Sequence, residues 1–485
     1  MLINDLISNI KFKFEISGIA SDSREVQPGD LFISIPSVID NKKQKEYIQQ
    51  AIIKGAAGIV TDKNCHFYST TVPVIEVENP AFECAVIASK YFTRKPKYIM
   101  AVTGTNGKTS TVRFCEQIID YCGEKALSIG TLGVSKLNKV YRAKTHQFTN
   151  MDVLSLHKIL NNISDEGYNH VAMEATSHGL DQNRLEAIDL HAAAFTILGH
   201  DHLDYHQTLD RYLQAKIRLF SELLPAGKTA VINADIPETE VLLNVCRARG
   251  HKIVTYGYKG QEIKLLKSKT TETGQYIDLE IFGKIYSDIY LPLIGEFQTY
   301  NALAALGMAT SCPDINLEKA INALSSLSSV PGRMQYVGTY NSAHVYVDYA
   351  HSPDSLEKLL SSSRAHCEAK LHILFGCGGE RDQSKRQPMG EIAANLADHV
   401  YITDDNPRFE DPAKIRKEIM QTASNAIEIV DRASAIRQAM ENLKANDILL
   451  IAGKGHEEYQ IIGNNLLPFN DYETAHNIIN QRKSA

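Results

Sequence analysis

A strand, a glycine-rich turn and a helix follow one another near residue 100, and this unit constrains the fold of the chain more than any other feature. The apolar run 98–102 leads into the turn, and 109–121 has the spacing of an amphipathic helix. Glycines let backbone N–H groups converge on phosphate oxygens, and the helix N-terminus adds positive potential. Lys108 supplies a mobile charge, and the Thr109 hydroxyl can hold Mg²⁺. We therefore predict a phosphate-binding loop made of Gly104, Thr105, Asn106, Gly107, Lys108, Thr109 and Ser110.

This loop is shorter than the usual eight-residue pattern, because Val102 stands where that pattern has glycine. The difference separates the chain from motor ATPases and small GTPases and indicates a particular subclass of nucleotide-binding proteins. The alternative is a chance Gly-Lys-Thr in a surface turn. The predicted strand before the loop and the predicted helix after it count against that alternative.

The length of 485 residues suits about three domains. A basic, proline-containing segment at 93–97 and a Val-Pro-Gly turn at 330–332 interrupt the pattern of strands and helices. We therefore predict three α/β domains, which cover residues 1–97, 98–332 and 333–485.

Strand-like and helix-like segments alternate in the last two domains, which is typical of parallel β–α units with helices on both faces of a sheet. A β-rich insertion is expected at 261–293. Ligands of such sheets bind at the carboxyl ends of the strands. The predicted strands cover 98–102, 170–173, 192–198, 229–232, 343–347, 371–375, 399–403 and 448–452, and the predicted helices cover 109–121, 151–163 and 212–224.

The charge balance argues against partners that are held by bulk charge. The chain has 51 basic and 57 acidic residues, a formal net charge of −6. We expect no nucleic-acid partner and no membrane insertion, because no block of like charges and no run of about 18 apolar residues occurs. The eight cysteines form no Cys-x-x-Cys pair, and the N-terminus has no signal-peptide pattern. These features predict a cytoplasmic protein, and we expect a monomer.

Titratable side chains follow the next predicted strands. Glu174 ends the strand 170–173, and a carboxylate beside a phosphate loop can bind Mg²⁺. The segment 200–206 holds three histidines and two aspartates, but neither cysteines nor paired ligands accompany them, which disfavours zinc. By periodicity alone, Lys216 is an ordinary helix lysine.

Six motifs, in this order, resemble the Mur ligases, the ATP-dependent amino-acid-adding enzymes of peptidoglycan synthesis. The likeness covers essentially the whole chain. It implies an N-terminal domain for a uridine nucleotide, a central P-loop ATPase domain and a C-terminal Rossmann-like domain for an amino acid. The motifs are Asp22-Ser23-Arg24 with Pro28-Gly29-Asp30-Leu31-Phe32, the phosphate loop, Asp201-His202-Leu203-Asp204, Gly376-Cys377-Gly378-Gly379-Glu380-Arg381-Asp382, Asp405-Asn406-Pro407-Arg408 and Gly453-Lys454-Gly455-His456-Glu457.

The resemblance also implies roles around ATP and Mg²⁺. Lys216 would be carbamylated, which turns a helix lysine into an anionic metal ligand. The implied metal ligands are Thr109, Glu174, His202 and Lys216, and the implied neighbours of ATP beyond the loop are Asn301 and Arg333. The implied catalytic set is Lys108, Glu174, His202, Lys216, Asp348 and His351, of which Asp348 would face the phosphates across the domain cleft.

The choice of amino acid turns on the run Asp405, Asn406, Pro407 and Arg408. An arginine fork binds a carboxylate through two parallel hydrogen bonds, and meso-2,6-diaminopimelate has a second carboxylate that lysine lacks. Arg408 therefore favours meso-2,6-diaminopimelate, and the family's lysine-adding members lack this arginine. The resemblance adds Arg381, Gly453 and Glu457 to the pocket. Without the resemblance, Arg408 is equally well a surface arginine paired with Glu410, and addition of L-lysine stays the alternative.

The other substrate that the resemblance implies is UDP-N-acetylmuramoyl-L-alanyl-D-glutamate. Ser21 and Ser23 would lie at its uridine end. The muramoyl-dipeptide would lie near Thr149, Asn150, Thr176, Gln182 and Arg184. The family usually has other residues at some positions of the chain, namely at 149–151, Thr176, Ile197 and Glu380.

The implied reaction uses ATP to convert the D-glutamyl side-chain carboxylate into an acyl phosphate, from which the incoming amine displaces phosphate. Such a transfer needs positioning and charge neutralisation, and closure of the domains would exclude water. A folylpolyglutamate synthetase is one alternative, although it has no use for a uridine domain. A P-loop ATPase that couples hydrolysis to a conformational change is another, although it offers no role for the last 150 or so residues.

Overall fold

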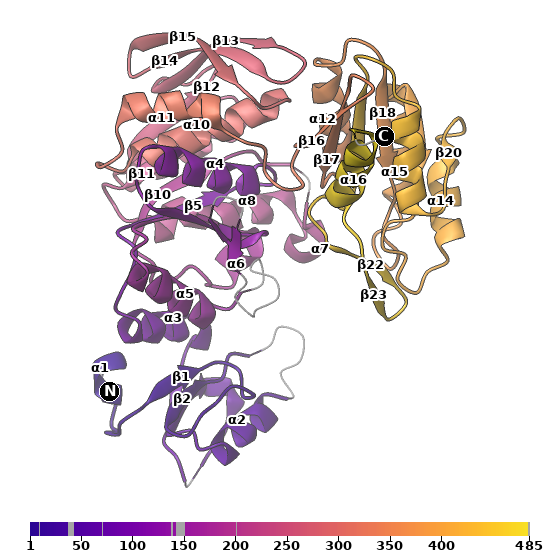
Figure 1. The fold of residues 1–485 in the computed structure, drawn as a ribbon. Coiled ribbons are helices and arrows are strands. Elements are labelled where there is room, and N and C mark those ends of the chain that lie inside the picture. The colour runs from indigo at the N-terminus through magenta and orange to yellow at the C-terminus, as the bar shows by residue number, and fades with distance from the viewer. Residues whose placement is uncertain are drawn as a thin grey trace.

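The computed structural model describes residues 1–8, 10–36, 43–69, 71–136, 139–141, 151–199 and 201–483. Strands of these residues form four sheets. Three bodies are visible in Figure 1: the indigo N-terminal body at the bottom, a purple to salmon body above it, and an orange to yellow body on the right. Helices cover largely parallel sheets in all three, which confirms the predicted α/β class.

The N-terminal body is a small parallel sheet with helices on both faces. Its four strands pair in chain order. Leu31 and Ile33 pack with α1 and α3, whereas Phe32 points to the opposite face and packs with α2, as the alternation of a strand requires. The elements are α1 (Ile3–Leu6), β1 (Gly18–Ala20), β2 (Asp30–Ile33), α2 (Gln44–Ile53), β3 (Gly58–Asp62), β4 (Val74–Val77) and α3 (Pro80–Tyr91).

The central body is built on an eleven-stranded sheet in the order β15-β14-β13-β12-β11-β10-β5-β9-β6-β7-β8. The strands from β13 to β6 in this order are parallel, and antiparallel strands extend both edges. The β-rich insertion expected at 261–293 is confirmed as β13 to β15. The strands are β5 (Tyr98–Thr103), β6 (Ala126–Gly130), β7 (Gly133–Lys136), β8 (Lys139–Tyr141), β9 (His170–Glu174), β10 (Leu190–Phe195), β11 (Thr229–Asn233), β12 (Lys252–Gly257), β13 (Ile263–Thr270), β14 (Gln275–Ile281) and β15 (Lys284–Leu291).

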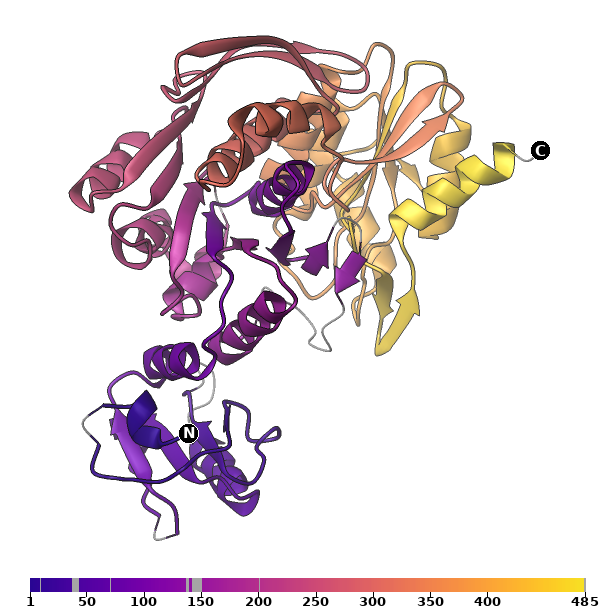
Figure 2. The same cartoon turned by 60° about the vertical axis from the view of Figure 1, so that its left-hand side comes forward.

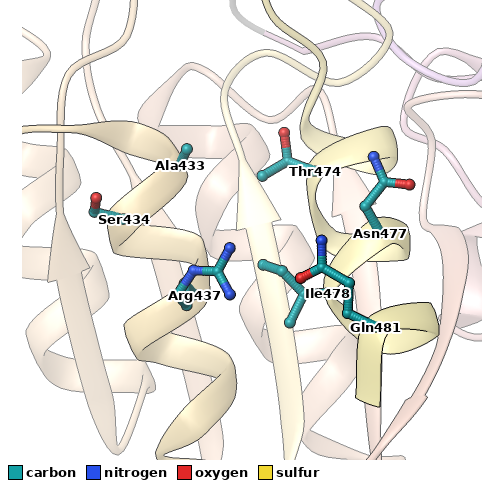
Figure 3. A pocket seen from close by; sticks show the side chains of 7 residues that line it. All are labelled: Ala433, Ser434, Arg437, Thr474, Asn477, Ile478 and Gln481. Atoms are coloured by element: carbon teal, nitrogen blue, oxygen red, sulfur yellow. The ribbon is translucent and has the colours of Figure 1, made fainter. Parts of the chain in front are cut away.

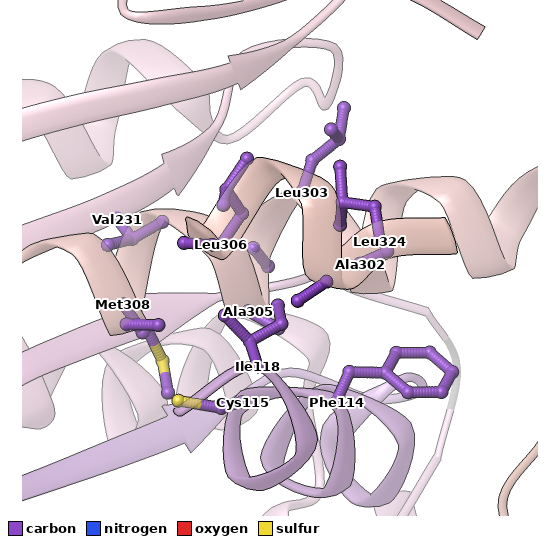
Figure 4. Close-up of a cluster of buried hydrophobic side chains, with 14 of the residues drawn as sticks. Phe114, Cys115, Ile118, Val231, Ala302, Leu303, Ala305, Leu306, Met308 and Leu324 are labelled. Atoms are coloured by element: carbon purple, nitrogen blue, oxygen red, sulfur yellow. The ribbon is translucent and has the colours of Figure 1, made fainter. Parts of the chain in front are cut away.

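Two helices on one face of this sheet, α4 (Lys108–Tyr121) and α10 (Glu296–Thr310), pack against each other (Figure 4). Ala302 and Ala305 of α10 are small, which lets the helices approach closely, and Phe114 and Ile118 of α4 are completely buried. Burial of each such large side chain stabilises the fold by about 1.5–3 kcal/mol. The packing therefore fixes the helix that begins in the predicted phosphate loop.

Two predicted helices of the central body begin at other residues in the structure. The segment 151–163 starts as α5 (Val153–Asp165), because the Asp152 side chain accepts a hydrogen bond from the Ser155 amide at 3.1 Å and caps the helix. The segment 212–224 starts earlier, as α8 (Leu209–Arg218), with Thr208 as its cap, and continues into the π-helical turn Leu219–Leu223. The body also contains α6 (Ser177–Asp181), α7 (Leu203–His206), α9 (Thr239–Ala248) and α11 (Leu317–Ala323).

The C-terminal body has a six-stranded sheet in the order β16-β17-β21-β18-β19-β20, in which only β16 is antiparallel to its neighbour. All four strands predicted here are confirmed. The sheet consists of β16 (Gln335–Tyr340), β17 (Ala343–Asp348), β18 (Leu371–Phe375), β19 (His399–Ile402), β20 (Ile427–Glu428) and β21 (Ile448–Ala452). Around it lie α12 (Pro353–Arg364), α13 (Arg386–Leu396), α14 (Pro412–Met420), α15 (Arg432–Glu441), α16 (Asp471–Lys483) and the hairpin of β22 (Tyr459–Ile462) and β23 (Asn465–Pro468).

His366 ties the C-terminal body to the central one. Its Nε2 accepts a hydrogen bond from the Gly295 amide at 3.0 Å, and its Nδ1 donates to the Thr271 carbonyl oxygen at 2.6 Å. Burial lowers the pKa of His366, so the neutral ring with a proton on Nδ1 satisfies both contacts. Figure 2 shows the strands β13 to β15 reaching across to the C-terminal body. Among the helices of the described ranges, none is both long and apolar enough to cross a membrane.

Candidate active site

The predicted phosphate loop lies where β5 ends, between the carboxyl ends of β9 and β10. Two of its glycines are required by close contacts. A Cβ atom on Gly104 (φ 144°) would lie 1.9 Å from Oγ1 of Thr196, and one on Gly107 (φ 87°) would lie 2.3 Å from Oδ1 of Asn301. Thr196 also donates to the Asn106 carbonyl oxygen at 2.6 Å. The loop is therefore held in one shape by its neighbours, and Asn301 lies beside it, as predicted for a residue near ATP.

Thr105 links this loop to the segment after β10 and to α8. Its amide donates to the Ile197 carbonyl oxygen at 2.6 Å, and its Oγ1 accepts from the Gly199 amide at 2.9 Å. The Tyr212 hydroxyl donates to the same Oγ1 at 3.2 Å. Tyr212 lies one helical turn before Lys216, so these contacts place α8 against the loop.

The ammonium groups of two lysines bind carbonyl oxygens of the loop. Lys108 donates to the carbonyl oxygens of Gly104 and Thr105, each at 2.8 Å. Lys216, with 1% of its surface exposed, donates to the same Gly104 oxygen at 2.8 Å. Burial lowers the pKa of Lys108, and burial together with the charge of Lys108 holds the pKa of Lys216 well below its ordinary value. The environment therefore favours a neutral, nucleophilic amine at Lys216.

Glu174 ends β9 as predicted, and its carboxylate lies near the phosphate loop, where its charge acts on Lys108. It accepts hydrogen bonds from the Thr131 amide at 2.8 Å and from the Thr131 hydroxyl at 3.1 Å. Gly130 makes room for it, because a Cβ atom there would lie 2.1 Å from Oε1 of Glu174. A hydroxyl on Thr109 and a carboxylate on Glu174 are hard oxygen donors, which suit Mg²⁺.

His202 lies in a left-handed backbone conformation (φ 51°). Burial lowers its pKa, and the charges of Lys108 and Lys216 act in the same direction, so the neutral ring is favoured, which is the form that the predicted metal-ligand role requires. Its ring centre lies 4.7 Å from that of His178. Within the described ranges, which omit His200, no three His, Cys, Asp or Glu side chains form a metal-binding group.

The first residues of the C-terminal body lie near the phosphate loop, since the charge of Arg333 contributes to lowering the pKa of Lys108. Asp348 ends β17 and accepts from the amides of Met334 at 2.7 Å and Ala350 at 2.8 Å. Burial raises the pKa of Asp348, and the charge of Arg333 opposes that effect. The Arg333 guanidinium lies 4.6 Å from the ring centre of Tyr349. Arg333 and Asp348 are thus brought together, and the place of Asp348 opposite the phosphates stays a prediction.

His351 follows this pair. Its Nδ1 donates to the Tyr349 carbonyl oxygen at 2.8 Å, which leaves Nε2 as the acceptor of the neutral ring. Burial lowers the pKa of His351, and the charges of Lys385 and Arg333 lower it further. Ring contacts join Tyr349 to His351 at 4.6 Å and to His456 at 5.3 Å between ring centres.

The residues predicted for the amino acid converge at the carboxyl ends of β18, β19 and β21. Asn406 donates to Oε2 of Glu457 at 2.9 Å. A Cβ atom on Gly453 (φ 107°) would lie 3.0 Å from Oδ2 of Asp405, and one on Gly378 would lie 3.7 Å from Cγ of Arg381. Asp405, Asn406, Gly453 and Glu457 thus share one site, with the Gly376–Arg381 segment beside it.

Arg408 lies in this pocket in a left-handed conformation (φ 53°). Its guanidinium donates to the Gly379 carbonyl oxygen at 2.8 Å. The pairing of Arg408 with Glu410, which the sequence left open, does not form. Glu410 instead binds the buried Arg386 through both carboxylate oxygens, which lowers the pKa of Glu410 to about 2. Arg408 therefore contacts only backbone carbonyl oxygens among the described residues and keeps donors for a ligand carboxylate.

The residues predicted for the uridine substrate lie in two groups. Ser23 donates to Oε1 of Gln50 at 3.0 Å inside the N-terminal body, whereas Ser21 donates to Oδ1 of Asp152 at 3.3 Å and so reaches the central body. Thr149 and Asn150 lie outside the described residues.

In the second group, Thr176 caps α6 by accepting from the Gly179 amide at 3.1 Å, and Arg184 donates to Oε1 of Gln182 at 2.6 Å. Burial lowers the pKa of Arg184, and the charge of Asp152 opposes this effect. Thr176 and Arg184 line a pocket together with Glu174, so this pocket opens towards the predicted metal site.

A second hollow lies on the outer surface of the C-terminal body, between α15 and α16 (Figure 3). Its lining includes Ser434, Arg437, Thr474 and Asn477. None of the predicted site residues lies there.

Sequence reasoning did not select Lys454, Tyr349 or Thr196, which contact predicted site residues. Lys454 was visible only as one letter of the Gly-Lys-Gly motif, and its contact with Asn406 joins segments 48 residues apart. Thr196 has no signal beyond its place at the end of a predicted strand. Only the tertiary structure brings these side chains to the site.

Comparison with known proteins agrees with this geometry. The family model of the Mur ligase middle domain matches residues 102–309, and that of the Mur ligase glutamate ligase domain matches residues 332–455. The UDP-N-acetylmuramoyl-L-alanyl-D-glutamate--2,6-diaminopimelate ligase of Brucella melitensis biotype 1 is 43% identical over 472 residues, which are 97% of this chain and 95% of that protein.

Solved structures of similar proteins cover the same architecture. A UDP-N-acetylmuramoyl-L-alanyl-D-glutamate--2,6-diaminopimelate ligase is 30% identical, with a TM-score of 0.74 over 100% of this chain and 99% of that one. The Mycobacterium tuberculosis folylpolyglutamate synthase, solved with ADP and AMPPCP, is 18% identical and covers 77% of this chain and 92% of its own, with a TM-score of 0.63. The latter likeness is one of fold alone.

Proposed function

Since this chain belongs to the Mur ligase family, we propose that it is the ATP-dependent ligase that joins meso-2,6-diaminopimelate to UDP-N-acetylmuramoyl-L-alanyl-D-glutamate. It forms an amide bond and produces ADP. The reaction is a step of peptidoglycan precursor synthesis in the cytoplasm, on which cell wall biogenesis, cell shape and cell division depend. The three bodies would receive, in chain order, the uridine nucleotide, ATP and the amino acid.

One observation carries the choice of amino acid: the Arg408 guanidinium has no carboxylate partner among the described residues, because Glu410 pairs with Arg386 instead. A guanidinium whose partners are backbone carbonyl oxygens has no carboxylate of its own, so a ligand carboxylate gains a charge-assisted, bidentate contact there. The distal carboxylate of meso-2,6-diaminopimelate meets this requirement, and L-lysine does not.

The phosphate loop fits a nucleoside triphosphate. Its amides lie at the start of α4, and Lys108 now occupies the loop's own carbonyl oxygens, which are weaker partners than phosphate oxygens. Asn301 and Arg333 flank the loop on the sides of α10 and of the C-terminal body. Thr109, Glu174, His202 and a carbamylated Lys216 would hold Mg²⁺, which supplies neutralisation of the phosphate charge when bound.

The environment of Lys216 supports the carbamate. A carbamate forms when a neutral amine attacks CO₂, and the lowered pKa of Lys216 favours the neutral amine. The amine forms a bond to the carbon of CO₂ and releases a proton to solvent, so the product places an anion beside the Lys108 ammonium group. The two groups then attract each other, and the site gains an oxygen pair for a metal.

The remaining residues bind and orient the reactants. Arg184 and Thr176, in the pocket beside Glu174, would hold the dipeptide end whose carboxylate reacts. Glu457 would orient an amine of the amino acid, and Arg408 its far carboxylate. Because Arg333 and Asp348 belong to the C-terminal body and the loop belongs to the central one, closure of the cleft brings the three substrates together and excludes water.

The test is the release of ADP with UDP-N-acetylmuramoyl-L-alanyl-D-glutamate and either meso-2,6-diaminopimelate or L-lysine. We expect turnover with the former only, and a loss of kcat/KM of about tenfold or more for Arg408→Ala, since hydrogen bonds to charged groups contribute about 1.5–3 kcal/mol. Arg437→Ala, in the hollow between α15 and α16, is the matched control. Equal turnover with L-lysine would assign lysine addition instead, and ADP release without any amino acid would favour a hydrolysing ATPase.

A further inference from the structure

Lys454 is a buried charge at the end of β21. None of its surface is exposed, and it stands between two glycines with left-handed backbone, Gly453 (φ 107°) and Gly455 (φ 55°). A buried ammonium group is costly unless it is paired and hydrogen-bonded. Its partners therefore show why the chain keeps a lysine here.

The two partners come from different loops of the amino-acid pocket. Nζ of Lys454 donates to Oδ1 of Asn406 at 3.0 Å and to Oε2 of Glu457 at 2.8 Å. Asn406 also donates from Nδ2 to the same Oε2 at 2.9 Å, and the Ile461 amide donates to Oδ1 of Asn406 at 3.0 Å. Lysine, amide and carboxylate thus form a closed triangle, and the backbone contact fixes which end of the amide is oxygen.

The triangle leaves Glu457 with one carboxylate oxygen for a ligand. Both donors fall on Oε2, and among the described residues none hydrogen-bonds to Oε1. The carboxylate keeps 23% of its side-chain surface exposed, in contrast to the buried Lys454. A group that approaches from the pocket therefore meets a carboxylate oxygen whose position is already set.

The same contacts hold the loop that carries Arg408. Asn406 lies two residues before Arg408, and the hairpin of β22 and β23 supports the loop through the Arg408 amide, which donates to the Ile461 carbonyl oxygen at 3.1 Å. Lys454 thus acts on both ends of the pocket, the carboxylate of Glu457 and, through Asn406, the guanidinium of Arg408.

We propose that Lys454 is a positioning residue for amino-acid specificity, which fixes Glu457 to receive an ammonium group and Arg408 to receive a carboxylate of the same ligand. The ligand class is an amino acid with an ammonium group at one end and a second carboxylate at the other. This inference rests on the proposed function and extends it from the residues that touch the amino acid to the one that sets their spacing.

The test is a double-mutant cycle of Lys454→Met and Glu457→Gln, with separate KM values for the amino acid, ATP and the uridine substrate. We expect Lys454→Met to raise the KM for meso-2,6-diaminopimelate by about tenfold to a hundredfold, which corresponds to the loss of hydrogen bonds between charged groups. The other two KM values should stay within about twofold. Lys370→Met, which removes an ion pair with Asp398 elsewhere on the same sheet, is the matched control and should change none of them.

Because Lys454 acts partly through Glu457 and partly through Asn406, the two effects should combine to less than their product: the KM of the double variant should exceed that of Glu457→Gln by a smaller factor than Lys454→Met produces in the wild type. A wild-type KM for the amino acid in Lys454→Met, a parallel rise of all three KM values, or multiplying effects in the cycle would each overturn the inference. Should Lys454→Met not fold, the double variant decides, because it removes both charges of the ion pair together and is then compared with Glu457→Gln.

Failure of the proposed function gives a different result. In that case the wild type itself does not turn over meso-2,6-diaminopimelate. The same cycle is then measured with the amino acid that the wild type accepts, and Lys454 must raise the KM for that amino acid alone.

Discussion

Lys108 and Lys216 share one acceptor, because the Nζ atom of each lies 2.8 Å from the carbonyl oxygen of Gly104. Two ammonium groups on one oxygen repel each other, and the loss of solvent around the half-buried Lys108 and the buried Lys216 disfavours both charges. The arrangement is relieved when Lys216 is neutral, or when it becomes an anion. The charge of residue 216, whether cationic, neutral or anionic, therefore determines the electrostatics of the predicted ATP site.

Replacement of Lys216 by alanine should therefore abolish ligation rather than weaken it. The variant lacks the atom that would carry the carbamate, and a short-chain carboxylate such as acetate, supplied in the assay, should occupy the space and restore part of the activity. ADP release with and without the added acid measures both effects. A fully active Lys216→Ala variant, or one that needs no carboxylate, would contradict the carbamate.

Replacement of Gly104 by alanine should weaken nucleotide binding by about tenfold or more, because overpacking costs about 1–3 kcal/mol and here falls on the loop itself. The added Cβ would lie 1.9 Å from Oγ1 of Thr196 and 3.1 Å from the backbone of Ile197. Gly123→Ala is a matched control: Gly123 also has a positive φ of 99°, but no atom lies within 4 Å of a Cβ there. Isothermal titration with ADP and Mg²⁺ distinguishes the two, and equal affinities in both variants would refute the steric explanation.

Replacement of Arg432 by methionine should lower the free energy of unfolding by about 3–5 kcal/mol, because it leaves a buried carboxylate without its partner. Arg432 and Asp471 are both fully buried, their two hydrogen bonds are 2.7 Å long, and Arg432 also donates to the Ala452 carbonyl oxygen at 2.9 Å. The double variant Arg432→Met with Asp471→Leu should recover much of the loss. Urea unfolding measures both, and a double variant less stable than the single one would speak against the buried charge as the cause.

The contact of His366 predicts a loss of stability in mild acid. Its folded pKa is held below the ordinary value of 6.5 by burial, so below about pH 6.5 the unfolded chain binds a proton that the folded chain does not. Stability is therefore fully present above that pH and declines as the pH falls towards the folded pKa. Protonation of Nε2 would also break the hydrogen bond from the Gly295 amide.

A comparison of wild type with His366→Gln isolates this group from the other buried histidines, such as His372, whose pKa burial lowers to about 4. Thermal unfolding at pH 7.5 and at pH 5.5 is the measurement. The variant should be less stable than wild type at pH 7.5 and lose less stability on acidification. If the variant loses as much stability between pH 7.5 and pH 5.5 as the wild type does, His366 is not the cause of that loss.

The phosphate loop could be predicted from the sequence because its chemistry is local: the glycines, Lys108 and Thr109 are consecutive, and strand and helix adjoin them. The same holds for the run 405–408. Contacts between distant segments could not be predicted in this way. Arg408 and Glu410 are close in sequence and suggested a pair. Glu410 pairs with Arg386 instead, because the guanidinium of Arg386 is fully buried and an unpaired buried charge costs more free energy than an unpaired charge that reaches solvent.

The starts of two helices also show what the local sequence alone could not predict. Asp152 and Thr208 are ordinary capping residues, and their role depends on a hydrogen bond to an amide three residues later. Periodicity alone extended the first helix over its cap and began the second one turn late. In the triangle of Lys454, Asn406 and Glu457, the lysine and the glutamate lie three residues apart in one motif, whereas Asn406 comes from a distant segment that the order of the strands brings next to them.

The strands β13 to β15 pair antiparallel with one another and extend one edge of the central sheet, where they have no evident role in binding a nucleotide. Yet the Thr271 oxygen lies in the turn between β13 and β14, and the Gly295 amide follows β15, so both groups that hold His366 belong to this edge. A version of the central body without these strands would lose both hydrogen bonds that join it to His366 of the C-terminal body. Chimeras between relatives should therefore exchange residues 263–295 and the loop around residue 366 as one cassette.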